Sequence, residues 1–190
     1  MQATVADIFR PRTAGRAIGY DLAAALAGSV LIALLAQAAV GAPVPITGQT
    51  LGVLLVGAAL GSRRGALAVV MYLAQGAAGL PVFAHGGFGL HHMLGPTGGY
   101  LFGFVPAAFV VGALAERGWD RKPLTTVAAM AVGNIIIYAV GATWLAIWLG
   151  SAGRALALGV VPFLIGDGIK IALAAALLPG AWKVLGRSSI

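Results

Sequence analysis

The stretch PFLIGDGIK, Pro162 to Lys170, places two charged side chains inside a run that is otherwise uncharged from Ala155 to Trp182. Insertion scales assign each such residue a cost of roughly 2.5 to 3.5 kcal/mol at the centre of a bilayer. Asp167 and Lys170 are three residues apart, which puts both on one face of a helix, where they can neutralise each other. A charged pair in this setting indicates a ligand site inside a helical bundle. A salt bridge that only fixes helix packing is the alternative.

The composition around this stretch is that of a membrane protein. Of the 190 residues, 60% are hydrophobic and 9% are charged, and the mean hydropathy is +0.97. These values predict a single polytopic membrane domain over residues 1–190. The formal net charge of +7 is explained by orientation in a membrane, so it does not indicate a nucleic-acid partner. The absence of cysteine excludes disulfides and thiolate metal sites.

Six apolar segments predict six transmembrane helices and therefore an all-α membrane protein. Their approximate bounds are 19–40, 49–60, 65–78, 99–115, 125–149 and 160–182. The second and third segments are shorter than the about 17 to 25 residues that normally span the hydrocarbon, so they must extend into their flanks. The basic start and the first segment could mimic a signal peptide. The segment is long for one and further spans follow, so we interpret it as a membrane helix.

Lysine and arginine gather in alternate connections between these segments, which predicts the orientation of the chain. Ten of them lie in the N-terminal tail, the second and fourth connections and the C-terminal tail, whereas the other connections hold only Arg154. The ten are Arg10, Arg12, Arg16, Arg63, Arg64, Arg117, Arg121, Lys122, Lys183 and Arg187. Because cytoplasmic connections collect basic residues, both termini are predicted to be cytoplasmic.

With this orientation, the polar side chains of the segments lie toward the outer half of the membrane. They are Gln37, Tyr72, Gln75, Tyr100, Asn134 and Tyr138, and Asp167 and Lys170 follow the same pattern. The cytoplasmic halves carry almost no polar side chains. This asymmetry predicts a pocket in the extracytoplasmic half that is closed on the cytoplasmic side. Trp144 and Trp148, one helical turn apart, form either an interfacial aromatic belt or a wall of the pocket.

Two outer connections are too apolar for ordinary solvated loops. The first, GAPVPITGQ (Gly41 to Gln49), is uncharged and is expected to fold against the protein as a lid. The second, Gly79 to Gly99, lacks helical periodicity, and its apolar side chains and glycines favour an ordered roof that approaches a ligand closely. His85, His91 and His92 in this roof suggest a metal site. No carboxylate or thiol accompanies them, which disfavours metal binding.

Further motifs narrow the classes of function. The sequence contains no GxxxxGK[ST] motif for ATP and no HExxH or Ser/His/Asp set that argues for chemistry. No internal repeat is visible, which disfavours a self-sufficient secondary transporter. Ala23 and Ala27 belong to a small-residue face on the first helix, at the spacing that allows close contact with another helix. That helix lies either in a partner or in the same chain.

Four stretches together resemble the BioY family, the biotin-specific S components of energy-coupling factor transporters. They are PVPITGQTLGVLL (Pro43 to Leu55), GSRRGALAVVMYLAQGAAGLPVFAHGGFG (Gly61 to Gly89), LGPTGGYLFGF (Leu94 to Phe104) and PFLIGDGIK, and they cover about a third of the chain. The resemblance implies six helices in the bacterial inner membrane and capture of biotin from outside, with no cofactor. It also implies a transmembrane coupling protein and two ATPase subunits as partners, with Ala23 and Ala27 against the coupling protein.

The chemistry of biotin fits the charged pair. Its ureido ring has two N–H donors and one carbonyl acceptor, which Asp167 and Lys170 can satisfy together. Its thiophane ring and valeryl chain require apolar walls, which the roof and Trp144 or Trp148 can supply. The candidate contact residues are Thr47, Gln49, Phe83, Gly86, Gly87, Gly98, Gly99, Tyr100, Asn134, Tyr138, Trp144, Asp167 and Lys170. The roles of Asn134 and Tyr138 rest on their depth alone, because the middle of the fifth helix matches no family motif.

Three functions therefore remain open from the sequence. The favoured one is biotin capture for import; the others are a stand-alone facilitator of another small solute and, with less support, an intramembrane enzyme that uses Asp167 as acid or base. The expected partners are biotin, membrane lipid and the energising subunits. The sequence leaves open whether the chain works alone, as a homo-oligomer or only with its partners.

Overall fold

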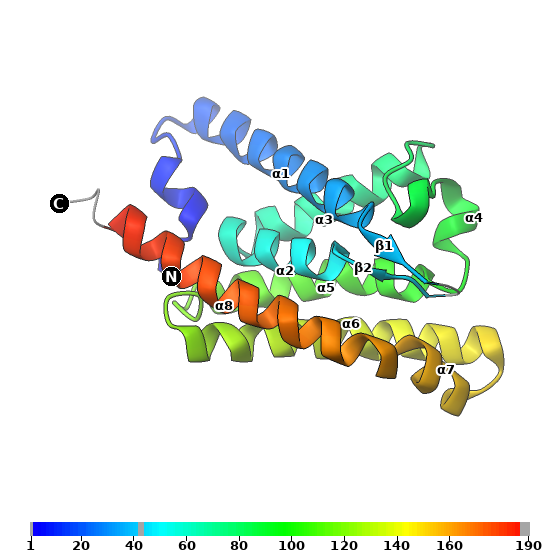
Figure 1. Cartoon of the computed structure of the whole chain (residues 1–190). Helices are drawn as coiled ribbons and strands as arrows, with labels where there is room; N and C mark the ends of the chain where they lie inside the picture. The colour runs from blue at the N-terminus through cyan, green and yellow to red at the C-terminus, as the bar shows by residue number, and fades with distance from the viewer. Residues whose placement is uncertain (1, 42–43, 187–190) are drawn as a thin grey trace.

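The structure, a computed structural model, describes residues 2–41 and 44–186 (Figure 1). Each of the six predicted segments overlaps one helix of at least 12 residues: α1 (Ala14–Ala36), α2 (Gln49–Leu60), α3 (Ser62–Ala77), α5 (Gly98–Ala115), α6 (Pro123–Leu149) and α8 (Leu164–Gly186). The shorter elements are η1 (Val5–Phe9), β1 (Ala39–Val40), β2 (Ile46–Thr47), η2 (Ala84–Gly86), α4 (Gly89–Met93), α7 (Ala152–Gly159) and η3 (Val161–Phe163). Within the described residues, four stretches are long and apolar enough to cross a membrane: α1, α5, α6 and Ala152–Leu185. The chain is therefore a mostly helical membrane protein.

The helices α1 and α3 begin earlier than expected, and α8 continues to Gly186. Two other helix ends differ from the expected bounds because the connections have structure of their own. The first helix ends at Ala36 rather than near residue 40, since β1 pairs with β2 in an antiparallel hairpin that sets Ala39 opposite Thr47. This hairpin is a small exception to the predicted all-α class. The last helix begins at Leu164, after α7 and the turn η3. Pro162 has no N–H to donate within a continuing helix and is instead accommodated at the start of this new turn.

The centre of the bundle is α5, which packs against α6, α2 and α3. Glycines allow the closest approaches. A Cβ atom at Gly57 of α2 would lie 2.6 Å from the carbonyl oxygen of Ala108 in α5, and one at Gly65 of α3 would lie 2.7 Å from the Cα of Gly57. The three helices therefore meet backbone to backbone, as small residues permit in membrane bundles. The helices α1 and α8 flank this core (Figure 1).

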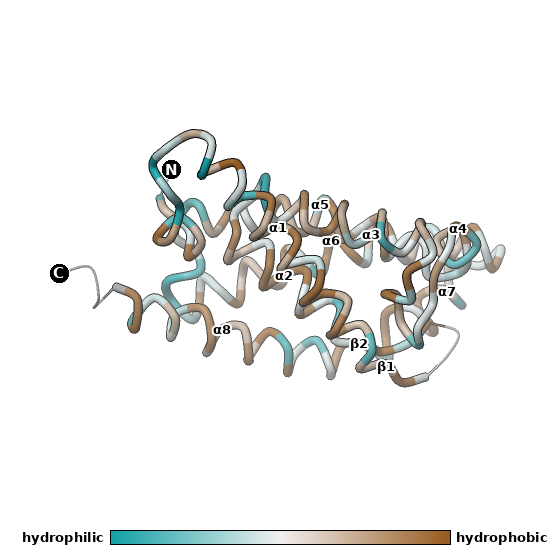
Figure 2. The backbone as a smooth tube through the Cα atoms, turned by 90° about the horizontal axis from the view of Figure 1, so that it is seen from above, coloured by the Kyte–Doolittle hydropathy of each residue, from teal (hydrophilic) through white to brown (hydrophobic). Residues whose placement is uncertain are grey.

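The flanking helices expose large apolar side chains along their outer faces. Leu22 and Leu26 on α1 and Ile165 and Ile169 on α8 are examples. Figure 2 shows mostly apolar residues along the helices and many of the hydrophilic residues toward the two ends of the bundle. This distribution suits contact of the helix flanks with lipid and of both ends with water.

The small-residue face of α1 divides into two parts. Gly28 is buried and turns inward, where a Cβ atom would meet Val56 and Ala68 at 2.9 and 3.1 Å. Ala23 and Ala27 lie on the exposed side of the helix. Packing within the chain therefore uses Gly28, and the two alanines remain available to another surface.

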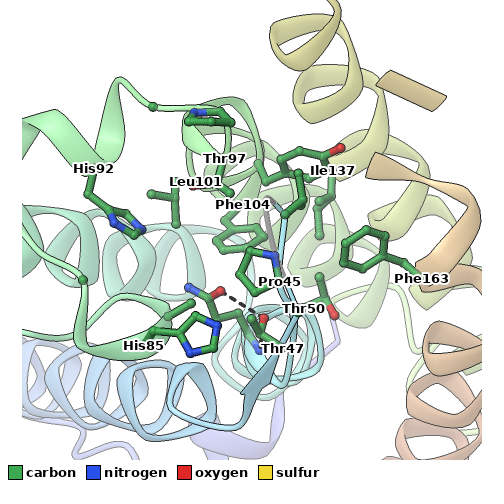
Figure 3. A pocket seen from close by; sticks show the side chains of 18 of the residues that line it. Pro45, Thr47, Thr50, His85, His92, Thr97, Leu101, Phe104, Ile137 and Phe163 are labelled. Carbon is green, nitrogen blue, oxygen red and sulfur yellow. Dashed lines mark hydrogen bonds between the residues drawn. The ribbon is translucent and has the colours of Figure 1, made fainter. Parts of the chain in front are cut away.

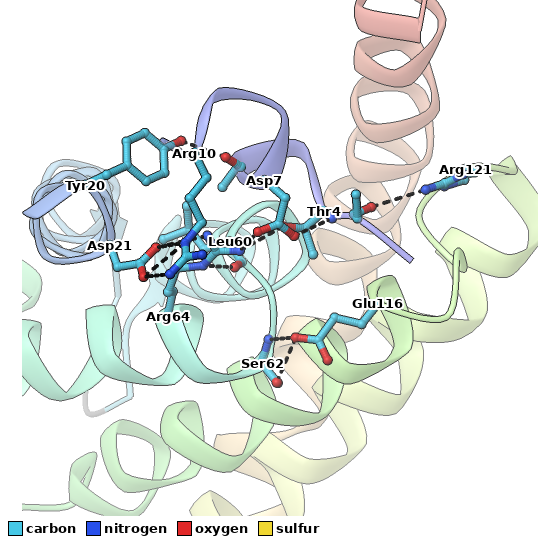
Figure 4. A network of polar contacts seen from close by, with 12 residues as sticks. Thr4, Asp7, Arg10, Tyr20, Asp21, Leu60, Ser62, Arg64, Glu116 and Arg121 are labelled. Carbon is cyan, nitrogen blue, oxygen red and sulfur yellow. Dashed lines mark hydrogen bonds and ion pairs between the residues drawn. The ribbon is translucent and has the colours of Figure 1, made fainter. Parts of the chain in front are cut away.

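The basic connections meet at one end of the bundle, which we call the basic end (Figure 4). Arg64, in the first turn of α3, forms ion pairs with Asp7 of η1 at 2.6 Å and with Asp21 of α1 at 3.2 Å. Asp21 also holds Arg10 at 2.7 Å. These contacts fold the N-terminal tail back over the corner between α2 and α3.

The C-terminal part of α8 reaches the same end. The indole Nε1 of Trp182 donates to Asp120 Oδ2 at 2.5 Å, and the Arg121 guanidinium lies 4.3 Å from the Trp182 ring centre. Asp120 belongs to the connection between α5 and α6, and burial raises the pKa of its carboxyl group. The N-terminal tail, the α2–α3 and α5–α6 connections and the end of α8 thus lie together at the basic end, as the distribution of basic residues predicts. Arg187, the last of those ten residues, lies outside the described residues.

The roof connection between α3 and α5 is partly helical, contrary to expectation, because it contains η2 and α4. Its anchor is Phe83, whose side chain is 0% exposed and meets the Tyr72 ring edge-on at 5.4 Å. The Gln37 amide donates to the carbonyl oxygen of Phe83 at 3.2 Å and accepts from the N–H of Gly86 at 3.2 Å. These contacts hold the roof at the end of the bundle away from η1 and the last turns of α8 (Figure 1).

Candidate functional site

A cavity of about 460 Å³ lies between the hairpin, the roof, α5, α6 and α8, in the half of the bundle away from the basic end (Figure 3). Its volume falls within the range of roughly 300 to 1,000 Å³ that is typical of small-molecule sites. The sequence predicted a pocket bounded by the lid, the roof and the charged pair, and elements from all three line this cavity.

One side of the cavity is a group of hydrogen-bonded side chains from three helices, which we call the polar wall: Thr50, Tyr138, Asp167 and Lys170. Lys170 Nζ donates to Asp167 Oδ1 at 3.0 Å and to Thr50 Oγ1 at 2.9 Å. The Tyr138 hydroxyl donates to Asp167 Oδ2. Asp167 is 4% exposed, so these partners and not bulk water stabilise its charge. The pairing on one helix face that the spacing predicted is present.

Thr50 was not among the predicted contact residues. It follows Gln49 directly in the first turn of the apolar segment, where a lone threonine gives little indication of function. Its role depends on α8, because Lys170 reaches it from 120 residues further along the chain. The sequence offers no local spacing that would pair the two.

A second hydrogen-bonded set joins the lid to the roof. Thr47 Oγ1 donates to Gln49 Oε1 at 3.0 Å, a bond drawn in Figure 3. Gln49 Nε2 donates to the Tyr72 hydroxyl at 2.6 Å, and that hydroxyl donates to the carbonyl oxygen of Val82 at 3.1 Å. Thr47 and Gln49 line the cavity as predicted. The bond from Gln49 to Tyr72 attaches the lid to α3.

Apolar side chains form much of the remaining wall. Tyr100 was predicted and lines the cavity, with its hydroxyl donating to the carbonyl oxygen of Gly159 at 2.8 Å. Leu101, Phe104 and Phe163 also line it and were not predicted. Phe104 lies one helical turn after Tyr100, so a search at helical spacing would have found it. Phe163 lies within the stretch that drew attention to Asp167.

Three histidines of the roof line the cavity at another side: His85, His91 and His92. His92 stacks on Phe83 with ring centres 5.2 Å apart, and burial, with His91 nearby, lowers its pKa. His85 has a positive φ of 56°, which is uncommon for a residue with a Cβ atom. Within the described ranges, no three His, Cys, Asp or Glu residues are placed to hold a metal ion.

Six predicted contact residues are not part of the cavity lining: Phe83, Gly86, Gly98, Gly99, Asn134 and Trp144. Trp144 lies behind the wall, where its Nε1 donates to the carbonyl oxygen of Gly95 at 2.9 Å and its side chain fills the space beside Gly99. Phe83 supports the roof from below. The sequence does not specify which way a side chain points around its helix or loop.

Comparison with known proteins agrees with this architecture. The BioY family model matches residues 8–187. The chain is 42% identical to the biotin transporter BioY of Rhizobium etli over 142 residues, 71% of this chain and 76% of that protein. It is 43% identical to the biotin transporter BioY of Thermotoga maritima over 136 residues, 71% and 79% of the two chains.

A solved structure gives the same result. The crystal structure at 2.1 Å of the S-component for biotin from an ECF-type ABC transporter is similar to this fold, with a TM-score of 0.76 and 26% sequence identity. The similarity covers 91% of this chain and 95% of that one. The resemblance read from four sequence stretches is confirmed, and the chain belongs to the BioY family.

Proposed function

We propose that the protein binds biotin in the cavity beside the polar wall and serves in its import as the S component of an energy-coupling factor transporter. The observation that carries the proposal is the polar wall itself, which presents a carboxylate and an ammonium together to a cavity of small-molecule size. Family membership and relatives described as biotin transporters support the same ligand. The family comprises transporter components, so the enzymatic interpretation of Asp167 is not retained.

The proposed placement follows from matching donors with acceptors. The ureido ring lies at the polar wall, where Asp167 accepts its N–H groups and Lys170 donates to its carbonyl oxygen. Leu101, Phe104 and Phe163 then contact the thiophane ring and the valeryl chain, whose burial removes apolar surface from water. Hydrogen bonds give the ligand its orientation, and the apolar wall adds affinity.

The valeryl carboxylate then points to the histidine side of the cavity. Neutral imidazoles can each donate one N–H to a carboxylate, and a protonated imidazole can donate two. His91 and His92 lie next to one another on α4 and both line the cavity. The two ends of the ligand thus meet different chemistry, which favours one binding direction.

We also propose that the chain crosses the bacterial inner membrane six times, with both termini in the cytoplasm and the cavity open to the outside. The segregation of the basic end from the cavity supports this orientation. The helix α2 has 12 residues and so rises about 18 Å, at 1.5 Å per residue, which is short of a hydrocarbon core of about 30 Å. The adjoining hairpin completes its path through the membrane.

Single cysteines at Gly87 and Gly153 test this orientation, since the chain has no cysteine of its own. Both residues belong to connections at the cavity end of the bundle, so both are expected to react with a membrane-impermeant thiol reagent in intact cells. A cysteine at Arg117, in the connection at the basic end, is the matched control and should react only after lysis. The reverse pattern would contradict the proposed orientation.

The energising partners are proposed to be a transmembrane coupling protein and two ATPase subunits. Ala23 and Ala27 are exposed on α1, where small residues allow a partner helix to approach closely. Packing of α1 within its own chain uses Gly28 instead, which supports assigning the alanine face to the coupling protein.

The function is tested by titrating the purified protein with labelled biotin. Saturable binding of one biotin per chain is expected, with competition by unlabelled biotin. Transport is then measured in vesicles: uptake that requires the energising subunits and ATP supports an S component, whereas uptake by this chain alone after ATP depletion would indicate a stand-alone facilitator. No saturable binding in a folded sample would contradict the proposal.

A further inference from the structure

A second, much smaller chamber lies between α2, α6 and α8, directly beside the main cavity. Its volume is about 10 Å³, and it shares Thr50 and Lys170 with the cavity. Leu54 and Met130 contribute apolar walls, and Asn134 contributes an amide. The two residues common to both spaces belong to the polar wall, so whatever occupies the chamber touches the groups assigned to the ureido ring.

Asn134 is the unexplained residue of this chamber. It is 7% exposed, and its side-chain amide makes no hydrogen bond with any of the described residues; the amide is not among their fully enclosed unpaired atoms, so a water can reach it. An unsatisfied polar group in a buried position costs about 1 to 3 kcal/mol, so such groups normally have a partner in the protein or an ordered water. An apolar residue would fill this position of α6 at lower cost, unless the amide has a use.

The other polar groups around the chamber also have unused hydrogen-bonding capacity. Lys170 has three N–H donors, of which two are directed to Asp167 and Thr50. The Thr50 hydroxyl accepts from Lys170, and its own hydrogen is directed to no acceptor in the part of the chain that is described. The hydrogen of Thr50 and the amide of Asn134 are therefore both left without a partner around one small space, while the third N–H of Lys170 is left for a ligand in the main cavity.

We propose that the chamber holds one ordered water that links Asn134 to Thr50, the acceptor of Lys170, and that Asn134 is a positioning residue for the ligand, acting through Thr50 and Lys170. The volume supports this assignment, because a chamber of roughly 10 to 15 Å³ is what one water requires. Donors and acceptors also balance: the water accepts from the Thr50 hydroxyl and donates to Asn134 Oδ1, which gives it the two to four partners typical of buried water.

This link has a direct consequence for recognition. The Lys170 side chain is long and flexible, and its ammonium group is held by Asp167 and Thr50. The water restrains the Thr50 hydroxyl from the chamber side, which fixes that acceptor of Lys170 and leaves the third N–H of the ammonium group for a ligand carbonyl. Asn134 was predicted from its depth to contact the ligand. Because it lines the chamber and not the main cavity, it supports the contact residues from behind and does not touch the ligand itself.

The inference rests on the proposed function for the identity of the ligand, and it is tested with the same titration. Asn134→Leu preserves the approximate volume and removes both amide atoms. It is expected to weaken biotin binding by about tenfold, comparable to the loss of one hydrogen bond to a charged group. Asn134→Ser retains a hydroxyl and leaves space for a second water, so it is expected to stay within about threefold of the original affinity. Ile136→Leu, on the same helix and outside both spaces, is the control.

A double-mutant cycle separates action through Lys170 from a general packing effect. In a Lys170→Met background, Asn134→Leu is expected to cause no further loss of affinity, because the group it positions is gone. A tenfold loss in both backgrounds, or unchanged binding by a folded Asn134→Leu protein, would overturn the proposal. If Asn134→Leu does not fold, the cycle is run with Asn134→Ser, for which a tenfold loss in both backgrounds has the same meaning.

A measurement without ligand distinguishes failure of this inference from failure of the proposed function. Thermal unfolding of the original protein, Asn134→Leu, Lys170→Met and the double variant is followed in detergent, in the absence of biotin. Non-additive shifts are expected, since the water and Thr50 join the two residues in one hydrogen-bonded chain. Additive shifts would reject the chamber link even if biotin binds. Absence of biotin binding together with non-additive shifts would reject the ligand and leave the link in place.

Discussion

Asp167→Asn is expected to weaken biotin binding by about 30-fold to several thousand-fold, which corresponds to the roughly 2 to 5 kcal/mol lost when a charged partner is removed from a desolvated site. The change preserves volume and removes the carboxylate that Lys170 and the Tyr138 hydroxyl contact. Lys170 is then left without its counter-charge, and the ureido N–H groups lose their strongest acceptor. Titration of the purified variant with labelled biotin measures the effect.

The partner variants decide whether the pair serves the ligand or only the fold. Lys170→Met is expected to cause a similar loss, because it deletes the donor to the ureido carbonyl. The double variant, Asp167→Asn with Lys170→Met, carries no unpaired charge, so its thermal stability should recover while binding stays weak. Recovery of near-original affinity would show instead that the pair is structural. Lys183→Met, near the other end of α8, is the matched control and should bind normally.

Gly57→Leu is expected to cause a large loss of stability. A Cβ atom at this position would lie 2.6 Å from the carbonyl oxygen of Ala108 and 3.0 Å from its Cα, and backbone atoms cannot move aside as a flexible side chain can. Forcing α2 away from α5 is expected to cost about 3 kcal/mol or more, the upper part of the range for overpacked cores. The measurement is the thermal unfolding midpoint in detergent.

The loss should extend to ligand binding, because α2 carries Gln49 and Thr50 into the cavity wall. Gly57→Ala adds only the Cβ atom, so it should also lower the thermal unfolding midpoint, but by less. Gly19→Leu is the control, since no atom of the described residues lies within 4 Å of a Cβ at that exposed position of α1. An unfolding midpoint for Gly57→Leu equal to that of Gly19→Leu would show that α2 and α5 separate without penalty and would contradict the proposed packing.

The sequence predicts the helical segments well because the physics behind them is local. A long apolar run must satisfy its own backbone hydrogen bonds in lipid, so it forms a helix wherever it lies in the fold. The segment 49–60 matches α2 at both ends. The errors occur where a non-local or backbone-specific effect intervenes: the hairpin ends the first helix early, and Pro162 delays the start of the last one.

Sequence spacing alone determined that Asp167 and Lys170 share a helix face, because three residues along one helix define an angle without reference to any other element. Composition likewise determined that the chain is a membrane protein, and the distribution of Lys and Arg determined which connections are basic. Only the tertiary structure decided which residues complete the wall around that pair. Thr50 joins it, while Trp144 supports the roof and Asn134 faces a separate chamber. The physical reason is that the direction of a side chain depends on how its helix is rotated against its neighbours, and that rotation is decided by packing between segments far apart in the chain.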